Sequence, residues 1–301
     1  MNNNNNNFFY GVLFALTTSL SLGVLGVIDK LGATHTVSPF IFSTQSVLFG
    51  LLFVTLFAFI YRKGAFINEL KKTSLQSWWL IIMVGLFASG LFVIFRFLGL
   101  TQSTGTFATL SQIITTAITA IFAFIFLKER LSGKFWALFI TIIIATYFVS
   151  VGNFTFTLLQ IGDNYILLGT LFLAAANIFS KLAIKKVSPI ILSFGRFLIG
   201  GLFLLLVSIF FFNSADLLNV TIWSILSGFF WTVNNTAFNF AIQRIGITLA
   251  TSLLMLAPVI TMTFEYFILK HQFNPIQIFA ALVVVMSGIV MVATKNKTQK
   301  F

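Results

Sequence analysis

Residues that could catalyse a covalent reaction or hold a metal ion are few and scattered in this sequence. It contains no Cys, two His (His35 and His271) and six acidic residues, namely Asp29, Glu69, Glu129, Asp163, Asp216 and Glu265. None of them stands at a spacing typical of a metal site or a nucleophile with its base. The sequence therefore predicts neither an enzyme nor a metal site, and no cofactor is expected.

Polar side chains within long apolar stretches are the other candidates for chemistry. Gln112, Thr116 and Thr119 follow one another at intervals of four and three residues, which places them on one face of a helix. Thr261 and Glu265 show the same spacing in a later stretch. Because polar groups are costly in lipid, such faces line a water-filled cavity or pack against another helix. We favour a cavity that binds a solute, with helix packing as the alternative.

Two amides and an indole extend this set of candidate solute-binding residues. Asn177 and Asn235 lie within apolar stretches, where an amide either binds a polar or zwitterionic solute or ties two helices together. Trp231 precedes Asn235 by about one helical turn. It is a candidate for an aromatic wall of the cavity, and packing is an equal alternative.

Arg96 and Glu265 lie at similar depths, each near the same end of its apolar stretch. They are candidates for an ion pair that closes one mouth of the cavity, and Glu265 is also the best candidate for a proton carrier. We favour the simpler interpretation, in which Arg96 extends to the lipid headgroups and Glu265 is neutral or hydrated. For Arg196 we expect a structural partner, a carbonyl group or Gln45, rather than the solute.

The composition identifies the surroundings of these residues. Of the 301 residues 58% are hydrophobic and 8% are charged, and 40 are Phe, whereas soluble domains carry about 25% charged residues. The charges are too few to cover a water-facing surface, so the sequence predicts an all-α membrane protein. The net charge of +12 does not indicate nucleic-acid binding, because the basic residues lie in short gaps between apolar stretches.

Ten stretches approach the roughly 20 apolar residues that a membrane-spanning helix needs. They cover residues 8–28, 38–60, 78–100, 105–127, 134–152, 164–183, 188–212, 220–241, 246–269 and 275–293. Residues 1–7, with six consecutive Asn, are expected to form a disordered leader, and residues 294–301 a basic cytoplasmic tail. No basic residue precedes the first stretch, so no signal peptide is predicted.

The basic residues favour one side of the predicted bundle. With the N-terminus in the cytoplasm, 14 of the 18 Lys and Arg fall in cytoplasmic segments and two in external ones. Cytoplasmic segments of membrane proteins carry such an excess. The sequence therefore predicts a multi-pass protein of the inner (cytoplasmic) membrane with both termini in the cytoplasm.

The two halves of the sequence resemble each other. Val37-Ser38-Pro39 opens the second stretch, and Val187-Ser188-Pro189 opens the seventh, 150 residues later. Residues 125–131, near the end of the fourth stretch, resemble residues 267–273 of the ninth, 142 residues later. We predict two five-helix repeats, 8–152 and 153–293. Because five is odd, the second repeat enters the membrane inverted, an arrangement typical of secondary transporters.

These features resemble the EamA-type transporters of the drug/metabolite transporter superfamily. The shared features are the five-plus-five spans, the Ser-Pro openings and Leu-Lys-Glu-Arg-Leu at residues 127–131. The resemblance covers residues 8–293 and implies ten helices, cytoplasmic termini, a central cavity and alternating access. Two positions depart from the family pattern: His271 stands where Glu is frequent, and Thr116 where Pro is common. The fourth helix is therefore expected to be straighter than usual.

The combined prediction is a secondary transporter that moves a small organic metabolite, such as an amino acid or a related compound. A multidrug exporter of the same fold is the first alternative. A membrane-embedded enzyme and a non-transporting subunit are weaker ones. The expected partners are the small-molecule solute and the lipid bilayer, with a homodimer left open and no nucleic acid.

Overall fold

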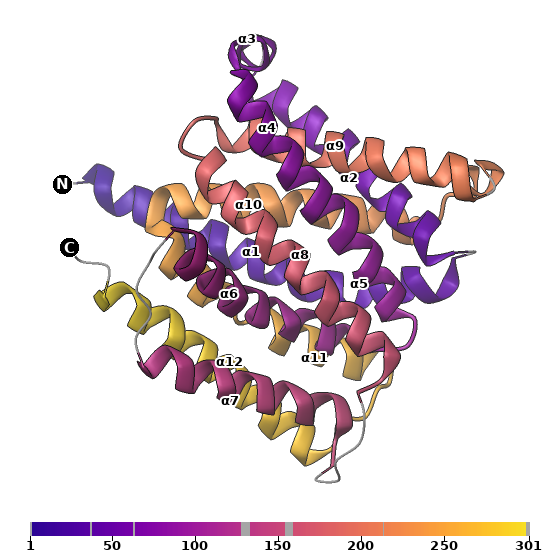
Figure 1. Cartoon of the computed structure of the whole chain (residues 1–301), viewed down its shortest axis with the longest axis vertical. Helices are drawn as coiled ribbons and strands as arrows, with labels where there is room; N and C mark the ends of the chain where they lie inside the picture. The colour runs from indigo at the N-terminus through magenta and orange to yellow at the C-terminus, as the bar shows by residue number, and fades with distance from the viewer. Residues whose placement is uncertain are drawn as a thin grey trace.

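The chain folds into a bundle of long helices that lie alongside one another (Figure 1). The computed structural model describes residues 2–36, 38–62, 64–127, 133–153, 159–212 and 214–298, and these residues form no strand. In chain order the elements are α1 (Asn2–His35), α2 (Pro39–Arg62), α3 (Ala65–Lys72), α4 (Leu75–Val84), the π-helix η1 (Gly85–Leu91), α5 (Phe92–Leu100), α6 (Gly105–Leu127), α7 (Gly133–Val151), α8 (Ile161–Ala183), α9 (Pro189–Phe211), the 3-10 helix η2 (Ser214–Leu218), α10 (Ile222–Leu254), α11 (Ala257–Ile268) and α12 (Pro275–Thr298).

Seven helical segments in the described part of the chain are long and apolar enough to cross a bilayer. They are Asn7–His35, Pro39–Arg62, Leu75–Leu100, Gly105–Phe126, Gly133–Val151, Ile161–Ala183 and Pro189–Phe211. The third is continuous although three elements, α4, η1 and α5, compose it. These segments correspond to the first seven predicted stretches, so an all-helical membrane protein is confirmed.

No loop separates the eighth predicted stretch from the ninth at residues 242–245. The residues stay helical from Ile222 to Leu254, and α10 ends at Met255 and Leu256. Residues 242–245 contain no Pro or Gly, and Gly246 follows them directly. Pro258 lies in the first turn of α11, where its missing N–H needs no partner.

The direction of α10 nevertheless reverses along α1. Its first part contacts α1 in antiparallel order and its last part in parallel order, as shown by the pairs Asp29–Ser227 and Phe14–Phe240, then Ser19–Leu253 and, in α11, Gly23–Thr261. The chain therefore turns back near Arg244. The guanidinium carbon of Arg244 lies 4.8 Å from the ring centroid of Phe14, within the range of a cation–π contact.

The two terminal helices extend further than predicted. Helix α1 begins at Asn2, within the leader that we had expected to be disordered. Adding a residue to an existing helix costs far less than starting a new one, which explains this extension. Helix α12 continues to Thr298, into the expected tail. Residues 128–131 of the repeated motif lie outside the described residues.

Helices that correspond between the predicted repeats pack against each other in antiparallel order. Along α2 and α9 the contacts are Phe40–Phe212, Thr44–Ser208 and Gly50–Phe197. At the other side of the bundle, α7 and α12 lie side by side (Figure 1). There, Gln277 near the start of α12 donates to the carbonyl of Val149 near the end of α7, at 3.0 Å.

Two close helix crossings also correspond between the halves. A Cβ atom added to Gly85 of η1 would lie 3.1 Å from the carbonyl oxygen of Arg196 in α9. A Cβ atom added to Gly228 of α10 would lie 2.7 Å from the carbonyl oxygen of Ser46 in α2. Gly228 follows Gly85 by 143 residues and Arg196 follows Ser46 by 150, in agreement with the offsets of the sequence motifs. The same crossing therefore occurs twice.

Replacement of Gly228 by Ala should lower the melting temperature of the purified protein in detergent. Ala stabilises a helix interior by about 0.5–1 kcal/mol relative to Gly, so a decrease would report the crossing itself. The new Cβ would lie 2.5 Å from Cβ of Phe49, and such overpacking costs about 1–3 kcal/mol. Gly64→Ala is the control, because nothing lies within 4 Å of its added Cβ. A Gly228→Ala protein as stable as the wild type would contradict a tight crossing.

Candidate functional site

Three carboxylates are buried at one end of the bundle. Asp29, Asp163 and Glu265 are 0%, 3% and 1% exposed. We call this end, where α1, α5 and α11 finish and α6 and α8 begin, the acidic end. A carboxylate without partners is very costly in an apolar environment, so each of the three requires compensating contacts.

Asp29 forms a fully buried ion pair with Arg96. The Nε atom of Arg96 donates to one carboxylate oxygen at 3.1 Å, and the hydroxyl of Ser227 donates to the other at 2.7 Å. Nη1 of Arg96 donates to the carbonyl of Ala108 at 3.1 Å. The guanidinium carbon lies 5.5 Å from the ring centroid of Trp231. One charge pair therefore connects α1, α5, α6 and α10.

The candidate pair between Arg96 and Glu265 is not formed, and Arg96 does not extend to the lipid headgroups. Residues 29–37 lie between the first two predicted stretches and were therefore expected to form a loop, but α1 continues to His35 and carries Asp29 into the bundle. Asp29 is thus the partner of Arg96 that the sequence reasoning missed. Lys30 points elsewhere and donates to the carbonyl of Leu100 at 2.6 Å.

Glu265 binds the start of α6 instead. Its carboxylate accepts hydrogen bonds from the backbone N–H groups of Gly105 at 2.7 Å and Thr106 at 2.9 Å, and from the Thr106 hydroxyl. The first N–H groups of a helix lack partners within it and carry partial positive charge, which favours an anion there. Since Glu265 lies in the second half and α6 in the first, this contact joins the halves.

Asp163, in the first turn of α8, joins the halves in a similar way. Its carboxylate accepts hydrogen bonds from the hydroxyls of Ser103, just before α6, and Ser150, near the end of α7. A carboxylate in the first turn of a helix is also favoured by the helix dipole. The acidic end is therefore held closed by polar contacts between residues distant in the sequence.

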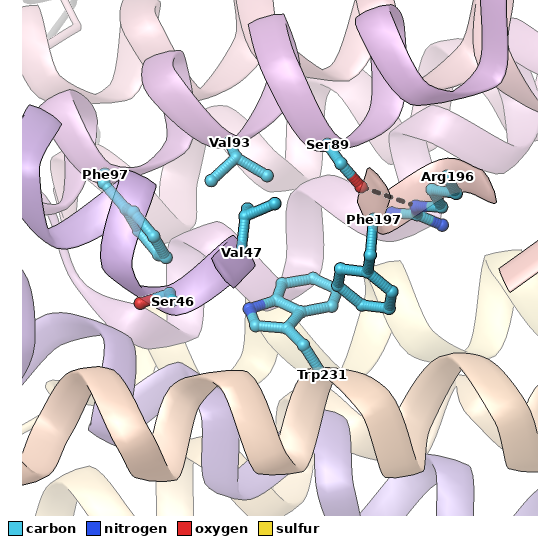
Figure 2. A pocket seen from close by; sticks show the side chains of 8 residues that line it. All are labelled: Ser46, Val47, Ser89, Val93, Phe97, Arg196, Phe197 and Trp231. Carbon is cyan, nitrogen blue, oxygen red and sulfur yellow. Dashed lines mark hydrogen bonds between the residues drawn. The ribbon is translucent and has the colours of Figure 1, made fainter. Parts of the chain in front are cut away.

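A small pocket lies inside the bundle, between α2, η1, α5, α9 and α10 (Figure 2). Its volume of about 10 Å³ leaves room for about one water molecule. The lining residues are Ser46, Val47, Ser89, Val93, Phe97, Arg196, Phe197 and Trp231. The pocket combines two hydroxyls, an indole and a guanidinium with apolar walls.

Arg196 is the charged residue of this pocket. Its guanidinium donates to the hydroxyl of Ser89 at 3.0 Å, the amide oxygen of Asn235 at 3.3 Å and the carbonyl of Ala88 at 3.4 Å. A carbonyl partner agrees with our expectation, whereas the predicted contact with Gln45 is wrong. Gln45 donates instead to backbone carbonyls of the segment after α9.

The predicted polar face of α6 is present and is half-buried. Thr116 donates to the carbonyl of Gln112 at 3.2 Å, and the hydroxyl of Thr119 accepts from the side chain of Asn177 in α8 at 3.2 Å. The Nε2 atom of Gln112 is buried and has no hydrogen-bond partner among the described residues. The structure thus brings Thr119 and Asn177 together, but neither lines the pocket around Arg196.

The remaining candidate residues for solute binding lie in two places, at the pocket around Arg196 and at the contact between α11 and α1. Trp231 lines the pocket, and Asn235 touches Arg196 beside it. Thr261 is fully buried against α1, where its hydroxyl donates to the carbonyl of Gly23 at 3.0 Å. This contact corresponds to the helix-packing alternative.

A larger groove of about 500 Å³ lies between α6, α7 and α8. Its lining is mostly apolar, and Ile143, Leu168 and Leu171 on its walls are between 39% and 45% exposed. In a bilayer such side chains face the lipid chains. Its polar lining consists of Thr146, Thr170 and Tyr147.

Three further polar residues of the site were missed by the sequence reasoning: Ser46, Ser89 and Ser227. A single Ser in an apolar helix is common in helix packing, so it gives no signal on its own. The repeat offset could have indicated Ser46, because it corresponds to Arg196 in the other half. Within the described residues, no group of three or more His, Asp or Glu could hold a metal ion.

The buried ion pair Asp29–Arg96 should contribute far more to the free energy of unfolding than the exposed pair Arg62–Glu69. Asp29→Asn leaves Arg96 buried without its counter-charge, and loss of one partner of a buried pair costs about 3–5 kcal/mol. Arg96→Met in the same chain should restore part of the loss, a coupling that thermal unfolding of both single variants and the double variant measures. Glu69→Gln, which removes the exposed pair with Arg62, should cost less than about 1 kcal/mol. Strictly additive losses at Asp29 and Arg96 would contradict the pairing.

Comparison with known proteins agrees with this architecture. The model described as "EamA-like transporter family" matches residues 9–151 and again residues 160–294. No curated protein gives a significant match. One solved crystal structure has a TM-score of 0.66 and 16% sequence identity, and the alignment covers 96% of this chain and 99% of that one; this likeness concerns the fold alone. Because the two family matches span nearly the whole sequence, the chain belongs to the EamA-like transporter family.

Proposed function

We propose that this protein is a secondary transporter that moves a small organic solute, an amino acid or a related compound, across the cytoplasmic membrane. Membership of a transporter family supports this proposal. The observation that carries it is the pair of corresponding crossings, Gly85 on α9 and Gly228 on α2, beside one pocket that contains Arg196. A site between two matching halves can open to either side of a membrane when the halves move.

The proposed transporter contains ten spans in two inverted repeats. The antiparallel packing of α2 with α9 and of α7 with α12 supports this arrangement, because corresponding helices of inverted repeats run in opposite directions. The reversal near Arg244 separates the eighth span from the ninth. The excess of Lys and Arg in alternate segments supports a cytoplasmic location for both termini.

Alternating access then requires the contacts at the acidic end to form and break. Glu265 on α6 and Asp163 on Ser103 and Ser150 join the two halves there. In this structure they are formed, so the acidic end is closed. We assign Glu265 to the gate of this end, with the start of α6 rather than Arg96 as its partner.

Counter-flow in proteoliposomes tests the transport proposal. Vesicles loaded with an unlabelled amino acid should take up the same labelled amino acid transiently, because a carrier exchanges solute across the membrane without net energy input. Each amino acid of a panel is tested against protein-free vesicles. Absence of counter-flow across the whole panel, with folded protein in the vesicles, would contradict the proposal. Counter-flow of cationic drugs alone would favour the multidrug alternative.

The gate at Glu265 is tested by access of a thiol reagent to a buried position. Thr109→Cys introduces the only Cys of the chain one helical turn beyond the Glu265 contact, at a position that is 0% exposed. Glu265→Gln places an amide against the N–H groups of Gly105 and Thr106, so the closed form is weakened. Labelling by a hydrophilic thiol reagent should therefore become several-fold faster.

A Cys at Ile142, which is also fully buried but lies in α7, serves as the control for general loosening of the fold. Its labelling should stay slow in both backgrounds. Unchanged labelling at position 109, or an equal increase at both positions, would argue against a gate at Glu265.

A further inference from the structure

We infer that the pocket around Arg196 binds a carboxylate group of the transported solute. This inference rests on the proposed transport function and narrows its substrate to small carboxylates with an apolar remainder, amino acids included. The inference starts from the charge of Arg196. In the part of the chain that the structure describes, the ion pairs are Arg62–Glu69 and Arg96–Asp29. Arg196 belongs to neither, although it lies within the apolar helix α9.

The groups that contact Arg196 are all neutral. They are a hydroxyl, an amide oxygen and a backbone carbonyl, at 3.0 Å, 3.3 Å and 3.4 Å. A positive charge inside a membrane protein without a counter-charge typically marks a solute or ion pathway. Arg96 differs in this respect: its Nε atom lies 3.1 Å from a carboxylate oxygen of Asp29. The fold therefore provides a counter-charge for the arginine that connects its helices, but not for Arg196.

Two further polar groups, one lining the pocket and one beside it, lack partners. The hydroxyl of Ser46 lines the pocket, is buried and has no hydrogen-bond partner among the described residues. The amide nitrogen of Asn235, whose oxygen accepts from Arg196, is likewise without a partner in that part of the chain. Buried polar atoms in native proteins nearly always have partners. Together these groups offer hydrogen-bond donors around one guanidinium, which matches an anion.

The remaining walls determine the rest of the solute. Val47, Val93, Phe97, Phe197 and Trp231 are apolar or aromatic (Figure 2). No carboxylate lines the pocket, and the charge of Arg96 behind Trp231 is already matched by Asp29. An amine without a carboxylate therefore meets the guanidinium of Arg196 and no anion, so the site disfavours cationic solutes.

The pocket must widen to admit the solute. Its volume of about 10 Å³ leaves room for about one water molecule, and Arg196 lies at the crossing of η1 with α9. At this crossing Gly85 faces the carbonyl of Arg196, and Gly200 faces Ser89. Separation of η1 from α9 would release the contacts of Arg196 with Ala88 and Ser89 together. The solute carboxylate would then replace these neutral acceptors with charged ones.

Two solutes that differ only in their charged group test this inference on the purified full-length protein. Both keep the branched chain of leucine: 4-methylpentanoate carries the carboxylate without the amine, and 3-methylbutylamine carries the amine without the carboxylate. Calorimetric titration of the wild type should give at least about tenfold tighter binding for the carboxylate, which corresponds to about 1.4 kcal/mol. Arg196→Gln should remove this preference and Arg196→Lys should keep part of it.

Ser46→Ala separates binding from folding, because its hydroxyl has no partner to lose. It should weaken carboxylate binding several-fold without lowering the melting temperature. Ser43→Ala is the matched control: Ser43 lies one turn earlier in α2, is 0% exposed and donates within its own helix to the carbonyl of Phe40. It should bind the carboxylate like the wild type.

Equal binding of the two solutes by the wild type, or no binding of the carboxylate, overturns the inference even if Arg196→Gln fails to fold. An unchanged preference in folded Arg196→Gln overturns it as well. Both results leave amino-acid counter-flow intact, so the transport proposal would survive them. Conversely, a carboxylate preference without counter-flow of any solute would reject transport while the subsite stands.

Discussion

The cost of burying a charge in a lipid bilayer is the constraint on which this structure depends. Asp29 meets it with a counter-charge, Arg96, and that pair fixes four helices relative to one another. Glu265 meets it with the first N–H groups of α6, and Asp163 with two hydroxyls. In each case the hydrogen-bond donors come from another part of the chain, so each of these buried carboxylates connects separate elements of the fold. Arg196 is the exception, because its charge is solvated by neutral groups only.

These connections between elements are unevenly distributed over the structure. The buried carboxylates that join the halves gather at the acidic end. The crossings of η1 with α9 and of α10 with α2 instead combine close glycine contacts with hydrogen bonds to neutral acceptors. Arg196 donates to Ser89 and Ala88 at the first crossing, and Thr232 donates to the carbonyl of Gly50 at the second.

The sequence predicted the helical membrane fold, the first seven spans and the family, because apolar length and the positions of Lys and Arg depend only on local composition. It also placed the repeat, through Ser38-Pro39 and Ser188-Pro189. The sequence did not predict which partner a buried charged residue has, because that depends on how the helices pack. Asp29-Lys30 looked like a loop because two charges are adjacent, yet one faces Arg96 and the other Leu100. The turn near Arg244 lies between the eighth and ninth predicted stretches, but the additional break at Met255 and Leu256, just before Pro258, was not predicted.

The π-helix η1 determines which neighbours its flanking residues meet. Residues seven apart, such as Ser89 and Arg96, share one face of a regular α-helix. In this span the π turn, closed by a hydrogen bond from Phe92 N–H to the Phe87 carbonyl, holds an extra residue. One extra residue rotates everything after it by about 100°. Ser89 therefore faces α9 while Arg96 faces α1. The two arginine sites, one with a carboxylate partner and one with neutral partners only, therefore lie on different faces of the same span, and without the extra residue of the π turn Ser89 and Arg96 would share one face.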